Sequence, residues 1–461
     1  MTTPANAYIT DVAYPAHFHR EMMPLWLHAT LTGIGIDAPS IERPFTWLEL
    51  GCGSAVNLLA AAARYPHSVF VGIDLSEREI EQARQWAKAC ALENVHFLCA
   101  NFEALSPEGV LPRLLGNEWR QAQVSAFDYI VSHGVYSWVN VQTRHAMHAI
   151  IGQYLKPKGI AYLAYNCQPG AATFAATQRL MYLNAQRLGG AHADHIHNSL
   201  DLALTVAQGG AGYFVEQPAA WRELERIRHM DTAYLAHEFF NRNWSALHVS
   251  DVMADLTQSN CVYAGSATPI ENIDAFSLPT KLRNLVSHMH HQGIGIAQIE
   301  TTKDIARNQT MRRDLYQKLP QASTAAPEKS PIQLSAQEHR AKLMKQRVAL
   351  LPAAQTAGKR DISIRIPTRI GPVELPAGHV QPIVQKLRNG SQTYAELTRL
   401  EPYCTAPGSL NPVLQTLAWA GWLQFAAAEQ DHAQTNAIAQ RLQQLRNIFI
   451  AANQPDLASQ I

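Results

Sequence analysis

The sequence has almost no net charge. Thirty-eight Lys and Arg residues stand against 37 Asp and Glu residues, which leaves a formal charge of +1 over 461 residues. A chain without a basic excess has no overall field that collects phosphate backbones or anionic lipid. We therefore expect neither nucleic acid nor a membrane surface as a partner.

Long apolar runs and paired cysteines are absent as well. No window holds the ~18 apolar residues of a membrane-spanning helix, and the first residues lack the basic start and apolar stretch of a secretion signal. The six cysteines, at positions 52, 90, 99, 167, 261 and 404, form no CxxC pair, so they match neither a disulfide framework nor a zinc site. These absences predict a cytoplasmic protein with reduced cysteines and no bound metal.

Enough apolar material is present for a large core. The chain is 47% hydrophobic and 16% charged, a composition that excludes disorder as its main state. At about 150 residues per domain, the length predicts about three domains or one large domain with an insertion.

Residues 45–165 alternate strand-like apolar runs with helical stretches. This order predicts an α/β fold of the Rossmann-like kind, a parallel sheet with helices on both faces. The expected strands cover residues 45–50, 69–73, 95–99, 127–131 and 160–165. Residues 1–44 precede them, and we expect this segment to fold over the site as a lid or to pack against the core.

The rest of the chain consists of several segments that differ in composition and periodicity. Residues 171–259 have helical periodicity and predict a helical insertion, after which 260–319 carries two short strands, Cys261–Ala264 and Arg313–Tyr316, that return to the sheet edge. Residues 320–361 are predicted to be a linker with a helix near 335–350. Residues 362–461 resemble a winged helix, but 366–461 contains six basic and six acidic residues. That balance favours packing or protein binding over DNA binding.

A glycine bend, Glu49-Leu50-Gly51-Cys52-Gly53, follows the first predicted strand. A dinucleotide site would need a small residue where Val56 stands, and Glu49 would repel phosphates. S-adenosylmethionine (SAM) has no phosphate; its ammonium suits Glu49, and its carboxylate suits the glycine amides and the start of the next helix. We therefore expect SAM, with Glu49, Gly51, Cys52 and Gly53 as contacts.

Two further strand ends provide polar and apolar groups for the nucleoside. Asp74, with Leu75 after it, ends the second strand 21 residues beyond Gly53, where a carboxylate can accept both ribose hydroxyls. Asn101 and Phe102 end the third strand, where an amide and an aromatic ring can meet adenine. The alternatives are a helix-capping aspartate and a plain loop.

Several segments resemble a known family. ELGCGSAVNLLAAAARYPHSVFVGIDLS, FDYIVSHGVYSWV and YLAYNCQPG, with DVAYPAHFHREMMP, YLAHEFFNRNWSALHVSDV and YAGSATPIEN, are similar to class I SAM-dependent methyltransferases that carry a methyltransferase regulatory domain, including bacterial (rickettsial-type) protein-lysine methyltransferases. The resemblance implies that 171–259 is the regulatory insert. It also implies cofactor contacts by Glu49, Gly51, Gly53, Asp74, Asn101, Phe102, His133 and Gly134. Ala55, where the family usually has glycine, and Asn101, where Asp is common, depart from the pattern.

Aromatic residues and one amide follow the fourth and fifth strands, beside the crevice where open α/β sheets bind ligands. Tyr136, Trp138, Tyr165 and Asn166 are the candidates for binding the methyl acceptor, because aromatic faces hold an ammonium and an amide can orient it. The alternative for the aromatics is core packing. His133 could serve as a base, but its strand end suits a cofactor contact better.

These observations predict a SAM-dependent methyltransferase that modifies a protein side-chain nitrogen, most simply lysine. Two alternatives stay open: a small-molecule methyltransferase, and an inactive SAM-binding scaffold. The histidine-rich stretches at 192–197 and 288–291 have no accompanying cysteine or acidic pattern, so we expect no metal there.

Overall fold

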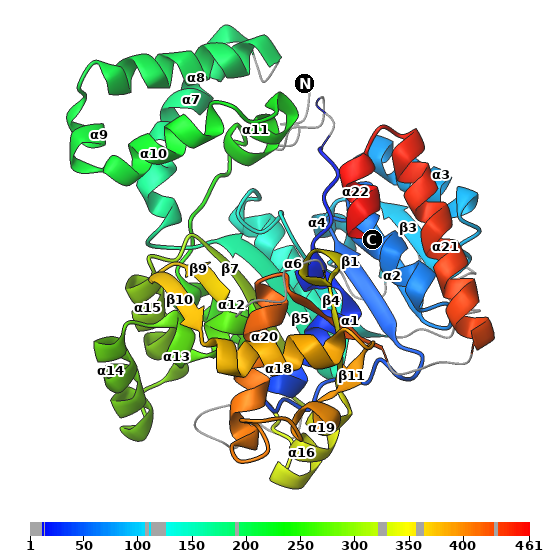
Figure 1. Ribbon diagram of the computed structural model, residues 1–461. Helices are drawn as coiled ribbons and strands as arrows, with labels where there is room; N and C mark the ends of the chain where they lie inside the picture. The colour runs from blue at the N-terminus through cyan, green and yellow to red at the C-terminus, as the bar shows by residue number, and fades with distance from the viewer. Residues whose placement is uncertain are drawn as a thin grey trace.

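The computed structural model describes residues 12, 14–106, 110–111, 126–189, 193–320, 330–355, 364–427 and 432–461. A central sheet with helices on both faces forms the core, a bundle of helices extends from one end of it, and the C-terminal segments pack against its side (Figure 1). In the described part of the chain, no helix is long and apolar enough to cross a membrane.

The central sheet contains seven strands in the order β3-β2-β1-β4-β5-β7-β6. Their bounds are β1 Thr46–Leu50, β2 Val69–Asp74, β3 Val95–Cys99, β4 Phe127–Ser132, β5 Leu155–Asn166, β6 Cys261–Ser266 and β7 Met311–Lys318. The first five pair in parallel, and β7 lies antiparallel between β5 and β6. The predicted Rossmann-like sheet is therefore confirmed, including the two strands expected at 261–264 and 313–316.

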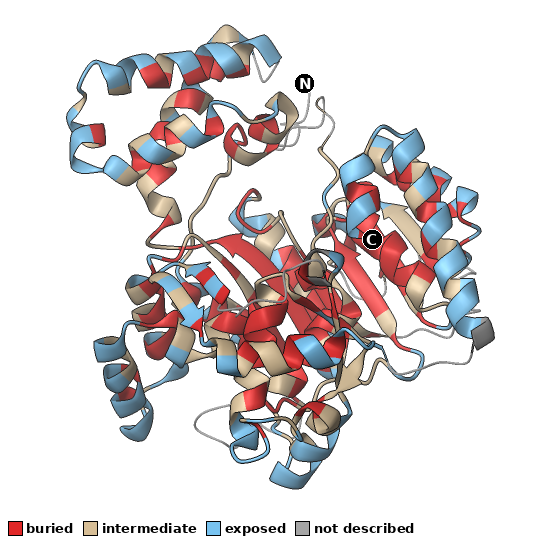
Figure 2. Cartoon of the chain, in the orientation of Figure 1, coloured by how far each residue is buried: buried red, intermediate tan, exposed pale blue. Residues whose placement is uncertain are grey.

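Both faces of the sheet are buried, as the alternation of side chains along each strand shows. On β1, Trp47 belongs to one apolar cluster and the next residue, Leu48, to the other. Phe70 and Val71 divide in the same way on β2. The sequences of such strands are continuous apolar runs because helices cover both faces of the sheet. Figure 2 shows this buried central layer.

The helices that flank the first three strands begin where the sequence predicts. α2 spans Val56–Arg64 and follows the glycine bend, and α3 spans Glu77–Ala89. The Ser76 hydroxyl accepts a hydrogen bond from the Glu79 N–H at 3.4 Å, which caps α3. The short helix α4, Phe102–Leu105, begins directly after β3, and α6 covers Val141–Tyr154.

The helical insertion forms a body with its own apolar core. It contains α7 Ala175–Leu188, α8 Ala193–Gln208, α9 Gly212–Glu216, α10 Pro218–Ile227 and α11 Thr232–Phe239, whose inward residues make one separate cluster. α12, Val249–Gln258, packs instead in the cluster on the central sheet. We call α7 to α11 the helical body; it stands apart from the sheet in Figure 1.

The segment between β6 and β7 and the C-terminal part complete the fold. α14 covers Thr280–His291 and α15 covers Ile296–Arg307. The C-terminal elements are α16 Ala336–Lys345, β8 Arg347–Leu350, β9 Ile364–Thr368, β10 Gly371–Leu375, α18 Ala377–Leu387, β11 Gln392–Thr393, α19 Tyr394–Leu397, α20 Leu410–Trp419, β12 Leu423–Ala426, α21 His432–Ala451 and α22 Pro455–Gln460.

One sequence-based expectation about the C-terminal part was right about a helix, α16, and wrong about where it ends. The helix expected near 335–350 ends at Lys345, and β8 follows it as the central strand of the sheet β11-β8-β12. Four residues are too few for periodicity to identify a strand, and pairing with β11 and β12 stabilises it. The winged-helix resemblance stays a prediction: α18, α19 and α20 precede β12, but α21 follows β12 and packs on α3 through Phe449 and Trp86, whose ring centroids are 5.2 Å apart.

Candidate active site

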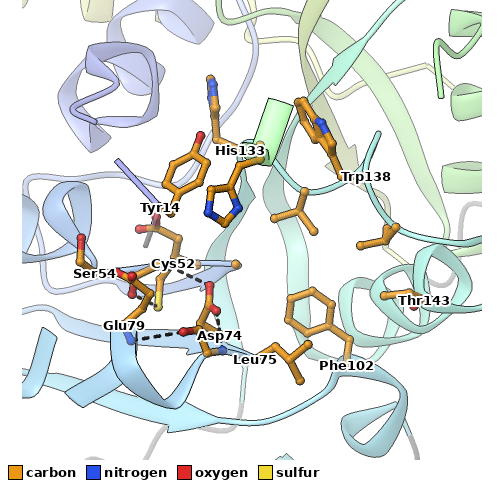
Figure 3. A pocket seen from close by; sticks show the side chains of 18 of the residues that line it. Tyr14, Cys52, Ser54, Asp74, Leu75, Glu79, Phe102, His133, Trp138 and Thr143 are labelled. Carbon is orange, nitrogen blue, oxygen red and sulfur yellow. Dashed lines mark hydrogen bonds between the residues drawn. The ribbon is translucent and has the colours of Figure 1, made fainter. Parts of the chain in front are cut away.

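A cavity of about 580 Å³ lies at the carboxyl ends of β1 to β4 (Figure 3). This is the edge where open α/β sheets bind their ligands. The ten residues predicted as cofactor contacts all line it: Glu49, Gly51, Cys52, Gly53, Asp74, Leu75, Asn101, Phe102, His133 and Gly134.

The glycine bend between β1 and α2 has a conformation that requires its glycines. Gly51 has φ +78°, and a Cβ there would lie 2.2 Å from Val135 Cγ2. Gly53 has φ +51°. Ala55 caps α2 with φ +62°, a left-handed conformation that glycine adopts more readily. This conformation explains why glycine suits the position where the sequence departs from the family.

Asp74 is held in place by two main-chain amides. The Gly53 N–H donates to Asp74 Oδ2 at 2.8 Å, and the Ser76 N–H donates to Oδ1 at 2.9 Å. Burial raises the pKa of Asp74, while these hydrogen bonds oppose the rise. Each oxygen keeps a second lone pair for a ribose hydroxyl.

Glu49 is a buried carboxylate with an unused oxygen. Its exposed fraction is 6%, and Oε2 has no hydrogen-bond partner among the described residues. Burial and the nearby charge of Asp74 raise the pKa of Glu49 to about 8. A buried unpaired carboxylate is costly unless a cation neutralises it, and the ammonium of SAM fits that need.

Two residues expected to meet adenine, Asn101 and Phe102, lie together in the cavity wall. Phe102 is largely buried, and Figure 3 shows it beside Leu75. Asn101 caps α4 by accepting a hydrogen bond from the Glu103 N–H at 3.1 Å. This bond uses one of the two lone pairs of the side-chain oxygen, and the amide NH₂ group can donate to an adenine nitrogen.

The N-terminal segment 14–19, here called the strap, closes one side of the cavity. Tyr14, His17 and His19 line it. The His19 ring stacks on His133 with centroids 3.7 Å apart, and the strap is tied to α2 because the His19 N–H donates to Asn57 Oδ1 at 2.9 Å. The expected lid segment thus contributes to the cavity wall.

His133 is unsuited to act as a base near neutral pH. It is hydrogen-bonded through Nδ1 to the Tyr162 hydroxyl at 2.7 Å, and burial lowers its pKa well below the usual value. Burial also lowers the pKa of His19 to about 3. Both rings are therefore neutral in the cavity wall.

Of the four predicted acceptor-side residues, the structure places only Trp138 in the cavity lining. Tyr136 lies in the core, where its hydroxyl and His148 Nε2 are 2.7 Å apart. The Tyr165 hydroxyl donates to Asp314 Oδ2 at 2.6 Å, also in the interior. The structure corrects the expectation that Tyr136 and Tyr165 face the acceptor. Both side chains lie in the apolar core that packs on the sheet, and buried partners satisfy both hydroxyls. Asn166 is buried at the end of β5 and does not line the cavity either, contrary to expectation.

Among the cavity residues that sequence reasoning missed, three come from a distant segment: His237, Arg242 and Asn243. They lie in and just after α11, about 100 residues beyond Trp138. The segment YLAHEFFNRNW, which contributes to the family resemblance, was the available signal. No group of three or more potential metal ligands occurs in the described residues; His192 lies outside them.

Comparisons with known proteins agree with this geometry. A family model described as a methyltransferase domain matches residues 41–227, and one described as a predicted methyltransferase regulatory domain matches residues 231–318. An uncharacterized protein of Synechocystis sp. is 28% identical over 86% of this chain and 71% of its own length. An uncharacterized protein of Rickettsia prowazekii is 26% identical over 56% of this chain and 46% of its own length.

A solved structure has the same fold. PKMT2 from Rickettsia typhi in complex with AdoHcy, the product that SAM leaves after methyl transfer, superposes with a TM-score of 0.66 and 20% identity, covering 90% of this chain and 78% of that one. With the family models, it confirms the resemblance found in the sequence and the predicted cofactor, SAM.

Proposed function

We propose that this chain, which belongs to the class I SAM-dependent methyltransferases with a methyltransferase regulatory domain, transfers the methyl group to lysine side chains of a protein acceptor. The enzyme class and the cofactor are established by the matches above; the acceptor is the proposal. The observation that supports this acceptor is the charge of the residues that line the cavity.

The described cavity lining contains four carboxyl groups, those of Glu49, Asp74, Glu79 and Glu103, and one guanidinium, that of Arg242. Burial raises the pKa of Glu49 to about 8, so near pH 7 this carboxyl ionises only when a cation pairs with it. The histidines of the strap and of β4 add no positive charge near pH 7, because burial lowers the pKa of His17, His19 and His133. Such a lining attracts an ammonium and repels phosphate. A lysine acceptor fits it better than a nucleic acid does.

When bound, SAM supplies an electrophilic methyl group on its sulfonium. The chain's own residues then position the reactants: Glu49 pairs with the amino-acid ammonium, Asp74 accepts from the ribose hydroxyls, and the strap limits access of water. The indole of Trp138 presents an aromatic surface for an approaching cation. No covalent step on the protein is needed.

The position of the helical body next to the cavity is evidence for a large acceptor. Its residue Phe239 and its neighbour Phe240 are buried in its own core, while His237 of the same helix lines the cavity. An acceptor protein can therefore contact this body while one side chain enters the cavity. PKMT2, a rickettsial protein lysine methyltransferase, has a similar fold, which adds support.

The test uses the purified chain, methyl-labelled SAM and a bacterial lysate separated into protein, RNA and metabolite fractions. We expect label in protein, and mass spectrometry should locate it on lysine. Label confined to metabolites or RNA would contradict the lysine proposal and indicate a small-molecule or RNA acceptor. Binding of SAM without transfer to any fraction would indicate a scaffold.

A further inference from the structure

A second cavity, of about 490 Å³, lies between the N-terminal segment and the C-terminal elements. Its lining comes from residues 18–23, from α1 (Pro24–Gly33), from the end of α2, and from β12, α21 and α22. Small-molecule sites have volumes of about 300–1,000 Å³. The described residues that line this cavity and those that line the cofactor cavity do not overlap, so the two cavities are separate.

One stretch of chain forms a wall of both cavities. His17 and His19 line the cofactor cavity, whereas Phe18, Arg20 and Met23 line the second one. Side chains of the strap and of the residues just after it are thus divided between the two cavities. A ligand that packs against Phe18 and Met23 therefore touches the same stretch of chain that closes the cofactor cavity.

Helix α2 is the other shared wall. Its first turn contributes Asn57 to the cofactor cavity, and its last residue, Arg64, lines the second cavity. Asn57 also joins α2 to the strap, because its side chain accepts the His19 N–H at 2.9 Å and donates to the His19 main-chain oxygen at 2.7 Å. Two hydrogen bonds therefore connect the two shared walls.

The guanidinium of Arg64 is a positive group of the second cavity without a counter-ion. Its Nε is buried and has no hydrogen-bond partner among the described residues, and no described carboxylate forms an ion pair with it. The other guanidinium, that of Arg20, is engaged. It lies 3.7 Å from Glu21 and donates to the main-chain oxygens of two further residues, Ala418 and Trp419. A buried donor without a partner is costly, so an anion beside Arg64 would be stabilising.

A second unused polar group lines the same cavity. The Tyr65 hydroxyl is buried without a hydrogen-bond partner in the described part of the chain. Burial raises the pKa of Tyr65 to about 12, so the hydroxyl keeps its proton and can donate it in a hydrogen bond. The main-chain oxygen of Ile461, which also lines the cavity, already accepts from Arg446 at 3.0 Å. The buried polar groups left unused can therefore both donate.

The rest of the wall is mainly apolar, and the cavity opens to solvent at one side. Three lining residues are exposed, Gln424 on β12 and Ser459 and Gln460 on α22. One unpaired guanidinium in an apolar wall suits a monoanion with an apolar body better than a phosphate dianion, which would leave a charge without a partner. The apolar lining residues are Phe18, Met23, Leu25, Trp26, Ala60, Leu351, Leu423, Phe425, Leu442 and Ile461.

We propose that the second cavity binds a carboxylate with an aromatic or aliphatic body, held by Arg64 and Tyr65, and that its occupation tightens SAM binding. The carboxylate accepts from the guanidinium and the hydroxyl, and its body covers the apolar wall. A ligand packed on Phe18 and Met23 restricts the strap before SAM arrives, so SAM loses less conformational freedom when it binds. The coupling is reciprocal, so SAM tightens carboxylate binding by the same factor.

The experiment titrates two probes into the full chain by calorimetry. Phenylpropionate is an aromatic carboxylate and hexanoate an aliphatic one; each is compared with its uncharged amide, and inorganic phosphate is the anion without an apolar body. The variants are Arg64→Gln and Tyr65→Phe. The matched control is Arg340→Gln, which removes an exposed arginine from α16. SAM affinity is measured with and without saturating probe, and urea unfolding checks that each variant is folded.

We expect at least one carboxylate to bind about tenfold more tightly than its amide, and the tighter of the two probes identifies an aromatic or an aliphatic body. Arg64→Gln should weaken this binding at least tenfold, as expected for the loss of a charged hydrogen bond. Tyr65→Phe should weaken it less, and Arg340→Gln should leave it unchanged. Saturating probe should tighten SAM binding about fivefold. Arg64→Gln should lack this gain but bind SAM alone within twofold of the native chain.

Three results would contradict the proposal. Equal affinity of carboxylates and amides, or of the native chain and Arg64→Gln, would exclude the site. Phosphate binding as tight as that of the carboxylates would exclude the ligand class, and carboxylate binding with unchanged SAM affinity would exclude the coupling. If Arg64→Gln is unfolded, Tyr65→Phe and the comparison of carboxylate with amide still decide. Every readout is binding, so the outcome is independent of the lysine acceptor.

Discussion

The main-chain N–H of Gly53 donates a hydrogen bond to Asp74 Oδ2 at 2.8 Å. This bond joins the bend after β1 to the end of β2 without any ligand, so the carboxylate that we propose for the ribose is already oriented. A preorganised contact loses less conformational freedom when the ligand binds. The glycine bend and the aspartate, which lie 21 residues apart in the chain, therefore act as one unit.

We expect Asp74→Ala to weaken SAM binding at least tenfold, equivalent to ~1.4 kcal/mol, because the ribose hydroxyls lose their acceptor. Calorimetry measures the affinity. Asp201→Ala, which removes an exposed aspartate from α8, is the matched control and should bind SAM as the native chain does. Equal affinity in the two variants would remove Asp74 from the ribose site.

Glu49 makes SAM binding depend on pH. Because the pKa of Glu49 is about 8 in the free protein, the carboxyl is protonated below that pH and must release its proton to pair with the ammonium. Affinity should therefore rise about tenfold between pH 6 and 7, a range in which an ordinary α-amino group stays charged. Glu49→Gln should bind more weakly and show a flat profile by calorimetry; a slope equal to the native one would exclude this pairing.

Gly51→Ala should be more damaging than Gly53→Ala. Both positions have positive φ, which costs a non-glycine residue ~1–2 kcal/mol, but only a Cβ at Gly51 meets another atom, Val135 Cγ2 at 2.2 Å; at Gly53 nothing lies within 4 Å. Urea unfolding and SAM affinity measure the difference. The double variant Gly51→Ala/Val135→Ala should regain part of the loss, and no regain would show that the clash is not its cause.

Arg312 holds three buried carboxylates, and its loss should be severe. Its guanidinium lies 2.8 Å from Asp314, 2.5 Å from Asp304 and 2.9 Å from Glu300. Arg312→Met would leave buried charges unpaired, so we expect a loss of about 3–5 kcal/mol in the free energy of unfolding. Lys342→Met, which breaks the solvent-exposed pair with Asp37, should cost less than about 1 kcal/mol. Similar losses in urea unfolding would contradict the distinction.

The cost of Arg312→Met should also shrink as the pH falls. Burial alone would raise the pKa of Glu300, but the charges of Arg312 and Lys303 lower it to about 2. In the native chain this group stabilises the fold above its unfolded pKa of about 4.3 and loses that contribution as the pH falls toward 2. Without Arg312, burial raises the pKa of Glu300, so the variant takes up this proton at a higher pH than the native chain. The difference between the two unfolding curves should therefore shrink as the pH falls from about 4 toward 2.

Much of the cofactor site was predictable because it depends on local order along the chain. A strand, a glycine bend and a helix place Glu49, Gly51 and Gly53 at one sheet edge, and the next strand ends at Asp74 at the same edge. Parallel strands with helical crossovers bring these ends together in any such sheet. The residues could therefore be named before their distances were known.

The acceptor side was less predictable because single residues and distant segments decide it. Tyr136 and Trp138 are two positions apart in an irregular loop, yet one packs in the core and the other lines the cavity. An irregular loop has no helical or strand periodicity, so its sequence does not predict which of its side chains are buried. His237 reaches the cavity from α11. The hydrophobic periodicity of that helix predicts which face is apolar, but it does not predict which element that face packs against.

By itself, the sequence determined the sheet, the cofactor and the ten predicted residues that line the cavity, because hydrophobic periodicity and turn residues act over a few neighbours. The tertiary structure alone decided that the Trp138 indole donates to the main-chain oxygen of Glu238, that Tyr165 turns inward to Asp314, and that the strap stacks His19 on His133. These contacts join segments about 100 to 150 residues apart. They form only when the packing of whole helices and strands has fixed the position of each side chain.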